Sequence, residues 1–216
     1  MFNLEMLRET LLMLPAILFG LCFHEFSHAY SAYKLGDPTP REQGRLNLNP
    51  MNHIDPLGFI LLLVAHFGWA KPVQINPEAF KHPKRDEVIV SLAGPAANLV
   101  SAFAFALLVK LAIDLRWYAI ATYGRPLITI LIYFVQINLV LAFFNLLPIP
   151  PLDGSHLLFV ILPDSWQSFK WNLYRYGSLI LIAIILLQSY AQFDILPIGR
   201  LVQAVYNGIF QLLGVK

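Results

Sequence analysis

Long apolar segments alternate with short polar ones along the chain, a pattern typical of proteins made of membrane-embedded helices. The first apolar helix is expected from about Thr10 to Gly36, where the run Gly36-Asp37-Pro38 is a stop signal. Three further long helices are expected over residues 86–114, 126–147 and 174–190. Each of them approaches or exceeds the ~20 residues that cross a bilayer.

Two shorter apolar segments fit a membrane span less well. The run at 57–67 falls short of ~20 residues, so we expect it to re-enter the membrane or to pack against the bundle. His66 within it is interpreted as a structural or interfacial histidine. The amphipathic tail at 197–215 could span or lie in the interface. The sequence therefore predicts an all-α polytopic membrane protein, a bundle of about five to six hydrophobic segments in a single domain over residues 1–216.

Two polar stretches between the first and second long helices have an alternating pattern that predicts short β-strands. Residues 44–49 alternate before a turn, and residues 70–77 alternate in the same way. If the apolar run between them re-enters the membrane, both stretches lie on the same membrane face. We therefore expect them to pair as a β-hairpin or small sheet inserted in the helical bundle.

The composition places the chain in the membrane and excludes several kinds of site. Its 216 residues are 57% hydrophobic and 13% charged, with a mean hydropathy of +0.61, which is outside the range of soluble domains. There is no basic block of the kind that binds nucleic acid. Cys22 is the only cysteine, so neither an intrachain disulfide nor a cysteine zinc cluster can form. Any bound metal must use histidine and carboxylate ligands.

The distribution of basic residues indicates the orientation in the membrane. If the run at 57–67 re-enters the membrane, most of the basic residues lie on one side of it. The next loop, on the other side, carries only Arg116 and Arg125. The positive-inside rule makes the first side cytoplasmic, so we expect a multi-pass protein of the plasma membrane with the His28 end of the first helix facing the cytosol. The basic residues on that side are Lys34, Arg41, Arg45, Lys71, Lys81, Lys84 and Arg85.

The first apolar helix carries a pattern typical of zinc hydrolases. His24 and His28 are four residues apart, so on a helix both imidazoles project from one face and can bind one metal. Glu25 is placed to take a proton from water at the metal. A five-residue pattern also arises by chance in many chains. Here the three ionisable groups lie in an apolar helix, where burial is expensive, and this favours the metal site.

Two histidines leave a catalytic zinc one protein ligand short of the usual three. Asp153 is the leading candidate, because the prolines at 148–151 break the helix before it and Gly154 follows it. Its carboxylate can then point into a cavity at membrane depth. His53 and His156 are rival ligands, and each could instead be a hydrogen-bond partner of a ligand.

Four motifs occur in an order that resembles the site-2 protease family of intramembrane zinc metalloproteases. They are His-Glu-Phe-Ser-His at 24–28, Asn-Pro-Met-Asn-His-Ile-Asp-Pro at 49–56, Gly-Pro-Ala-Ala-Asn at 94–98, and Asn-Leu-Leu-Pro-Ile-Pro-Pro-Leu-Asp-Gly at 145–154. The resemblance implies that His24, His28 and Asp153 bind one Zn²⁺ per chain and that Glu25 is the general base.

The resemblance also covers polar residues around these ligands. Asn145 and Asn98 fall on positions implied to hold the substrate backbone or the oxyanion, and His53 falls on a position close to the active site. For Asn98, a hydrogen bond in helix packing is an equal alternative. The implied function is hydrolysis of peptide bonds within or near the transmembrane segment of a membrane-protein substrate in the lipid bilayer. Residues 44–49 and 73–75 could offer an edge that pairs with the extended substrate.

Two rival functions stay open at this point. A transporter or another ion-handling membrane protein would need neither Glu25 as a base nor the proline-rich loop before Asp153. A proteolytically inactive scaffold would usually lack Glu25 or a ligand, and this chain retains both. The sequence contains neither the PDZ nor the CBS domain of larger family members, so it resembles a minimal catalytic core.

Overall fold

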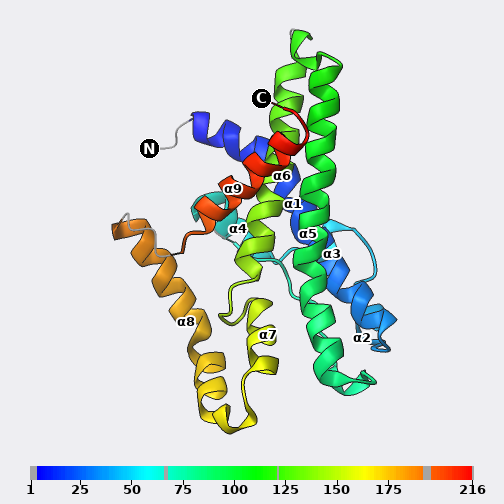
Figure 1. Cartoon of the computed structure of the whole chain (residues 1–216), viewed down its shortest axis with the longest axis vertical. Coiled ribbons are helices and arrows are strands. Elements are labelled where there is room, and N and C mark those ends of the chain that lie inside the picture. Colours follow the sequence, from blue (N-terminus) through cyan, green and yellow to red (C-terminus); the bar gives the residue numbers. More distant parts are fainter. Residues whose placement is uncertain (1–3, 66–67, 121, 192–195, 216) are drawn as a thin grey trace.

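A computed structural model describes residues 4–65, 68–120, 122–191 and 196–215, so His66 lies outside the described residues. The described chain is mostly helical (Figure 1). Four of its helices are long and apolar enough to cross a membrane, which confirms the predicted polytopic helical fold. They are α1 (Leu4–Lys34), α5 (Pro83–Asp114), α6 (Gly124–Asn145) and α8 (Gln167–Ala191).

The centre of the bundle is the antiparallel pair α5 and α6, with α1 packed against both (Figure 1). The pair is connected through the short helix η2 (Trp117–Ala119). Ala102 and Ala106 of α5 are fully buried in one cluster with Val135 and Leu139 of α6. Small residues let two helix backbones approach closely, and in lipid this close packing is a main source of helix association.

The chain after α6 does not continue as one helix. α6 ends at Asn145, and α7 (Gly154–Ile161) follows beside α5 after an irregular turn (Figure 1). The prolines at 148–151 have no N–H group to donate to a helix. The chain folds tightly onto the end of α6, because a Cβ on Gly154 would lie only 2.6 Å from the Leu147 carbonyl oxygen. The structure thus has the break that the prolines predict, directly before α7.

Two further helices account for the shorter apolar segments. α4 (Pro56–Ala65) has ten residues, ~15 Å of helix, which is too short to cross a bilayer. Its re-entry into the membrane stays a prediction. The 15-residue α9 (Ile198–Leu212) packs its apolar side, with Val202 and Phe210, over α6. Short helices in the connections are α2 (Thr39–Glu42), α3 (Pro50–His53), η1 (Pro77–Ala79) and η3 (Asp164–Trp166).

The predicted β-hairpin is wrong, because no β-strand forms among the described residues. Residues 44–49 instead make turns stabilised by the Asn47 side chain, whose oxygen accepts the backbone N–H of Asn49 at 2.8 Å. Local bonds of this kind compete with a β-ladder. Within the described residues, the second stretch makes an isolated antiparallel bridge between Ala70 and Ile54, which follows α3 and lies outside the first stretch.

Residues 70–76 form no β-strand. The backbone N–H of Lys71 donates to the His53 carbonyl, and the hydrogen bonds farther along the segment are to side chains. The N–H groups of Val73 and Asn76 donate to the carboxylates of Glu25 and Asp37, at 3.0 and 2.8 Å. These carboxylates belong to α1 and to the turn that follows it. The stretch therefore docks along the end of α1, and the alternating pattern reflects one side that faces the protein and one that faces outward.

Candidate metal centre

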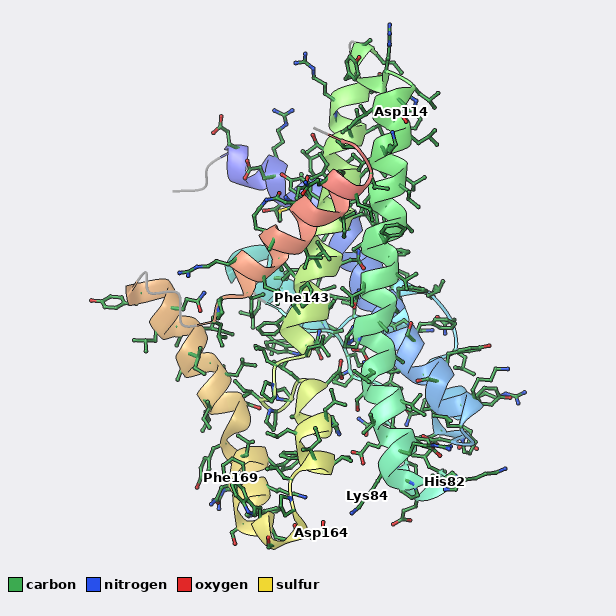
Figure 2. All side chains as sticks on the ribbon, viewed as in Figure 1. His82, Lys84, Asp114, Phe143, Asp164 and Phe169 are labelled. Carbon is green, nitrogen blue, oxygen red and sulfur yellow. The ribbon has the colours of Figure 1, made fainter. Side chains whose placement is uncertain are left out.

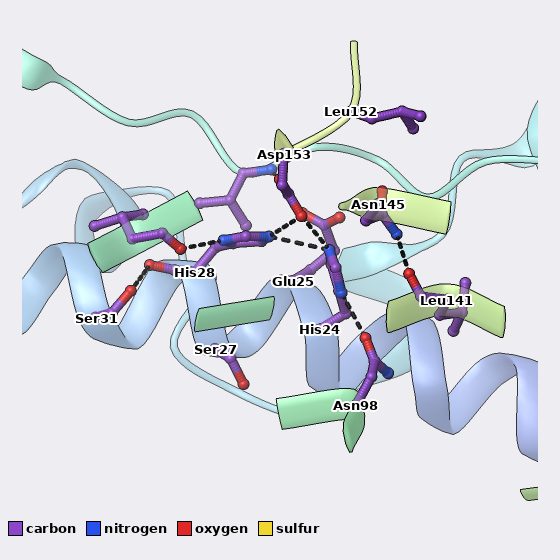
Figure 3. Close-up of polar contacts among 12 residues, drawn as sticks. His24, Glu25, Ser27, His28, Ser31, Asn98, Leu141, Asn145, Leu152 and Asp153 are labelled. Atoms are coloured by element: carbon purple, nitrogen blue, oxygen red, sulfur yellow. Dashed lines mark hydrogen bonds and ion pairs between the residues drawn. The ribbon is translucent and has the colours of Figure 1, made fainter. Parts of the chain in front are cut away.

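Three side chains that can bind a metal meet where α1 passes the break between α6 and α7 (Figure 3). His24 and His28 lie one turn apart on α1, with 3.0 Å between their Nε2 atoms. Oδ2 of Asp153 lies 3.1 Å from Nε2 of His24 and 3.3 Å from Nε2 of His28. Both histidines are buried and the aspartate is mostly buried. The structure thus brings together three of the residues singled out in the sequence.

The hydrogen bonds of His24 determine which of its nitrogens faces the other two residues. Its Nδ1 lies 2.6 Å from Oδ1 of Asn98, a fully buried residue of α5. The Asn98 amide nitrogen donates to the Gly20 carbonyl at 3.1 Å and to Oδ1 of Asn138 at 2.8 Å, so its oxygen faces the histidine. His24 must therefore carry its proton on Nδ1, and its Nε2 offers a lone pair.

His28 is held in the same tautomer by a backbone group. Its Nδ1 lies 2.7 Å from the carbonyl oxygen of Val90 on α5, and a carbonyl can only accept, so Nδ1 carries the proton. Two Nε2 lone pairs and the Asp153 carboxylate therefore converge. Oδ2 of Asp153 is buried and accepts no hydrogen bond from the described residues. Three electron-rich atoms this close together repel one another unless a shared proton or a metal ion lies between them.

The spacing and the chemistry of the three atoms fit zinc. Zn²⁺ binds histidine nitrogen and carboxylate oxygen at about 2.0–2.1 Å, so two ligands of a tetrahedral zinc lie roughly 3.3 Å apart. The distances between the ligand atoms here, 3.0, 3.1 and 3.3 Å, are close to that value. Three protein ligands leave one position open, which is the arrangement of catalytic zinc sites and not of structural ones.

Gly94 of α5 makes room for both imidazole rings. A Cβ at this position would lie 2.6 Å from Cε1 of His24 and closer still to Nε2 of His28. Any side chain would push the rings away, so the contact between α5 and the histidines requires glycine. One short motif thus supplies two features of the site, which are the space at Gly94 and the acceptor for His24 at Asn98.

Asn138 and Val90 contribute to the site, although neither was a candidate site residue in the sequence. Asn138 of α6 is fully buried, and its amide donates to the Phe134 carbonyl at 2.8 Å, which leaves its oxygen to accept from Asn98. An amide in the middle of an apolar helix is the signal that could have found it. Val90 acts through its carbonyl group, so its side chain carries no signal.

Glu25 follows His24 on α1 and projects beside the group of three (Figure 3). It is half-buried, and its Oε2 accepts the backbone N–H of Val73 at 3.0 Å. Oε1 makes no hydrogen bond with the described residues. Glu25 therefore has one carboxylate oxygen that is held in place and one that is available for proton transfer.

The other candidate residues lie outside the group of three. Asn145, the last residue of α6, donates to a carbonyl one turn earlier in the same helix at 2.9 Å. His53 is fully buried, and its Nε2 donates to the Asn47 carbonyl at 2.7 Å. His156 pairs through Nδ1 with the Glu87 carboxylate at 2.8 Å. The structure thus brings neither rival histidine to the metal group.

Comparison with known proteins places the chain in a family. A family model described as Peptidase family M50 matches residues 109–187. The chain is 39% identical over 200 residues to "Putative zinc metalloprotease YwhC" of Bacillus subtilis, and the alignment covers 91% of each protein. The chain belongs to peptidase family M50.

A second relative of this M50 protein is "Putative zinc metalloprotease Rip2" of Mycolicibacterium smegmatis. The two are 33% identical over 184 residues, which is 82% of the chain and 67% of Rip2. No solved structure matches the chain. These relatives confirm the resemblance to the site-2 protease family, and their names give zinc as the metal. The M50 protein is a multi-pass membrane metalloprotease, with a group of two histidines and an aspartate that fits Zn²⁺.

Replacing Asn98 tests whether the tautomer of His24 matters for metal binding. Asn98→Leu is expected to raise the Kd for zinc about 10–100-fold, because His24 loses the acceptor that fixes its ring and its proton. The measurement is competition of the purified protein with a chromogenic chelator. Asn207→Leu, at an exposed amide of α9, is the matched control and should leave the Kd unchanged. An unchanged Kd in Asn98→Leu would contradict the role of this bond.

Proposed function

We propose that this M50 metalloprotease hydrolyses peptide bonds within or near the transmembrane segments of membrane proteins. The observation that carries the proposal is the position of the group His24, His28 and Asp153. It lies between α1, α5 and the break after α6, among helices that are long and apolar enough to span a bilayer. A hydrolytic site at this place is accessible to a chain that is itself embedded in the membrane.

Each residue of the site has a separate task in this proposal. His24, His28 and Asp153 hold the zinc ion, which when bound polarises the scissile carbonyl and makes a water molecule a stronger nucleophile. Glu25 takes the proton of the attacking water and delivers it to the leaving amine. Asn145 has a second amide N–H that makes no hydrogen bond with the described residues, and this group holds the substrate backbone.

Asn98 serves the metal ligand and not the substrate. Both of its N–H groups are donated to neighbouring residues, so neither is left for an oxyanion. The substrate must present an extended backbone, because the carbonyl groups inside a helix are already hydrogen-bonded and shielded from attack. A substrate helix therefore unwinds locally before it is cut.

We place the metal group nearer the cytoplasmic side of the plasma membrane. His28 lies in the last third of α1, close to its basic end at Lys34. Figure 2 shows Lys84 at one end of α5 and Asp114 at the other. Most basic residues outside the long helices precede the Lys84 end along the chain, whereas the loop that follows the Asp114 end has few. The positive-inside rule assigns this end to the cytoplasm. The basic residues in the stretch of chain from the end of α1 to the start of α5 include Lys34, Arg41, Lys71, Lys81, Lys84 and Arg85.

The rival functions are less well supported by the site. An ion-handling protein needs a path for its ion, whereas the three ligand atoms here converge on one point and leave one position open. An inactive scaffold has no need for a carboxylate beside that point, yet Glu25 is present with one oxygen held by a backbone N–H. Hydrolysis uses all four residues.

The test is cleavage by the purified protein in liposomes with a panel of single-span membrane proteins. We expect product termini, read by mass spectrometry, within or near the hydrophobic segments. A zinc chelator should stop cleavage, and added zinc should restore it. Cleavage only in loops far from the membrane, or cleavage that a chelator does not affect, would contradict the proposal.

A further inference from the structure

An extended segment, residues 70–76, lies across the part of α1 that carries Glu25. We call this segment the strap. The backbone N–H of Lys71 donates to the His53 carbonyl at 2.8 Å, and the N–H of Asn76 donates to the buried carboxylate of Asp37 at 2.8 Å. The strap is therefore fixed at both ends, and its middle cannot move freely away from the helix.

One peptide group in the middle of the strap connects two charged side chains. The carbonyl of Pro72 accepts a hydrogen bond from Nη2 of Arg45 at 2.9 Å. The N–H of Val73, in the same peptide group, donates to Oε2 of Glu25 at 3.0 Å. A peptide group that accepts from a cation at its oxygen is polarised, which makes its N–H a stronger donor. Arg45 thus strengthens the hydrogen bond to Glu25 by polarising the single peptide group between them.

The surroundings of Arg45 are unusual for an arginine. Its side chain is buried, with 5% of the residue exposed, and it forms no ion pair among the described residues. The guanidinium donates to two backbone carbonyls, those of Asn52 and Pro72. Burial of a charge without an opposite charge is expensive, so a buried arginine without an ion pair is expected only where it has a structural or functional role. The polarised peptide group, whose N–H donates to the Glu25 carboxylate, gives Arg45 such a role.

We infer that Arg45 and the Pro72–Val73 peptide group form a positioning element for the general base of the protease. This inference rests on the proposed function, in which Glu25 moves the proton. The bond from Val73 holds Oε2, so that Oε1 is presented in a fixed direction beside the metal group. Arg45 does not touch the reacting atoms, and it acts through the strap.

The test compares Arg45→Gln with Arg41→Gln, using a membrane protein that the wild type cleaves in liposomes. Arg41 lies in the same connection between α1 and α5 as Arg45, but its side chain is exposed. Its replacement therefore controls for the loss of one positive charge. We expect kcat of Arg45→Gln to fall about 10–100-fold, because a misplaced base loses part of its contribution. KM should change less than about twofold and the zinc content should not change, because substrate contacts and metal ligands are untouched.

A proline pair tests the peptide N–H itself. Val73→Pro removes the donor to Glu25 and should lower kcat to a similar extent. Gln74→Pro places the same ring at the next residue, which is exposed and whose N–H makes no hydrogen bond with the described residues, and it should keep most of the activity. If Arg45→Gln does not fold, Arg45→Lys replaces it, because lysine keeps the charge but cannot bond both carbonyls in the same geometry.

Several results would overturn the inference. A higher kcat in Arg45→Gln would identify the strap as a lid, and a higher KM with unchanged kcat would identify it as a substrate contact. Loss of zinc in the variants would show that the strap supports the metal centre instead. A wild type that cleaves nothing in the panel would contradict the proposed function itself, whereas an active wild type with equally active Arg45→Gln and Val73→Pro would contradict only the positioning role.

Discussion

Glu25→Gln is expected to slow cleavage by about 10²–10⁴-fold while the protein keeps its zinc. Glutamine has nearly the same shape and can still accept the Val73 N–H through its carbonyl oxygen, so the strap stays in place. It cannot take a proton from water, and the loss of a general base costs about 10²–10⁴ in rate. The measurement is single-turnover cleavage in liposomes together with the zinc content of the same preparation.

The control for this variant is Glu78→Gln, which removes a carboxylate from an exposed position of η1. It should cleave at the rate of the wild type. Glu25→Gln with normal zinc and normal cleavage would mean that another group accepts the proton, and the assignment of Glu25 would be wrong. If wild type and Glu25→Gln bind zinc alike and neither cleaves any membrane protein, the inactive scaffold becomes the better description.

Asp153→Ala is expected to remove zinc from the protein as well as its activity. The substitution leaves two histidine ligands, and loss of a ligand costs more affinity than the ~10–100-fold lost with a partner of a ligand. The wild type should contain about one zinc per chain by elemental analysis, and Asp153→Ala should contain almost none after the same purification. His24→Ala should behave in the same way, because both residues belong to one group.

His156→Ala is the informative control, because His156 follows Asp153 closely in the sequence and was a rival ligand. Its imidazole pairs with Glu87 and lies outside the metal group, so this variant should keep its zinc. Loss of zinc in His156→Ala with retention in Asp153→Ala would reverse the assignment of the third ligand. The zinc content of Asp164→Ala, at an exposed aspartate, should equal that of the wild type.

The sequence was informative where one local rule decided the outcome. A four-residue spacing places His24 and His28 on one face of a helix, whatever surrounds that helix. Prolines at 148–151 must interrupt a helix, so the break before Asp153 follows from the chain alone. The long apolar segments were also predicted from one rule, because the length of a spanning helix must match the thickness of the bilayer.

The sequence was misleading where hydrogen bonds that the hydrophobic pattern does not report decided the outcome. The alternation at 44–49 fits a strand, but the Asn47 side chain takes the backbone into turns. Arg45 was counted among the basic residues of a loop, yet it is buried under the strap. The tautomer of His28 depends on a carbonyl of α5, and no property of the Val90 side chain reports that contact.

The position of Asp153 in the chain has a consequence for biosynthesis. His24, Glu25 and His28 leave the ribosome early and enter the membrane with the first helix, whereas Asp153 follows only after α5 and α6 have been made. Until then the growing chain holds only two of the three residues of the metal group. The metal group of this chain is therefore complete only when the segment beyond α6 has reached the bundle.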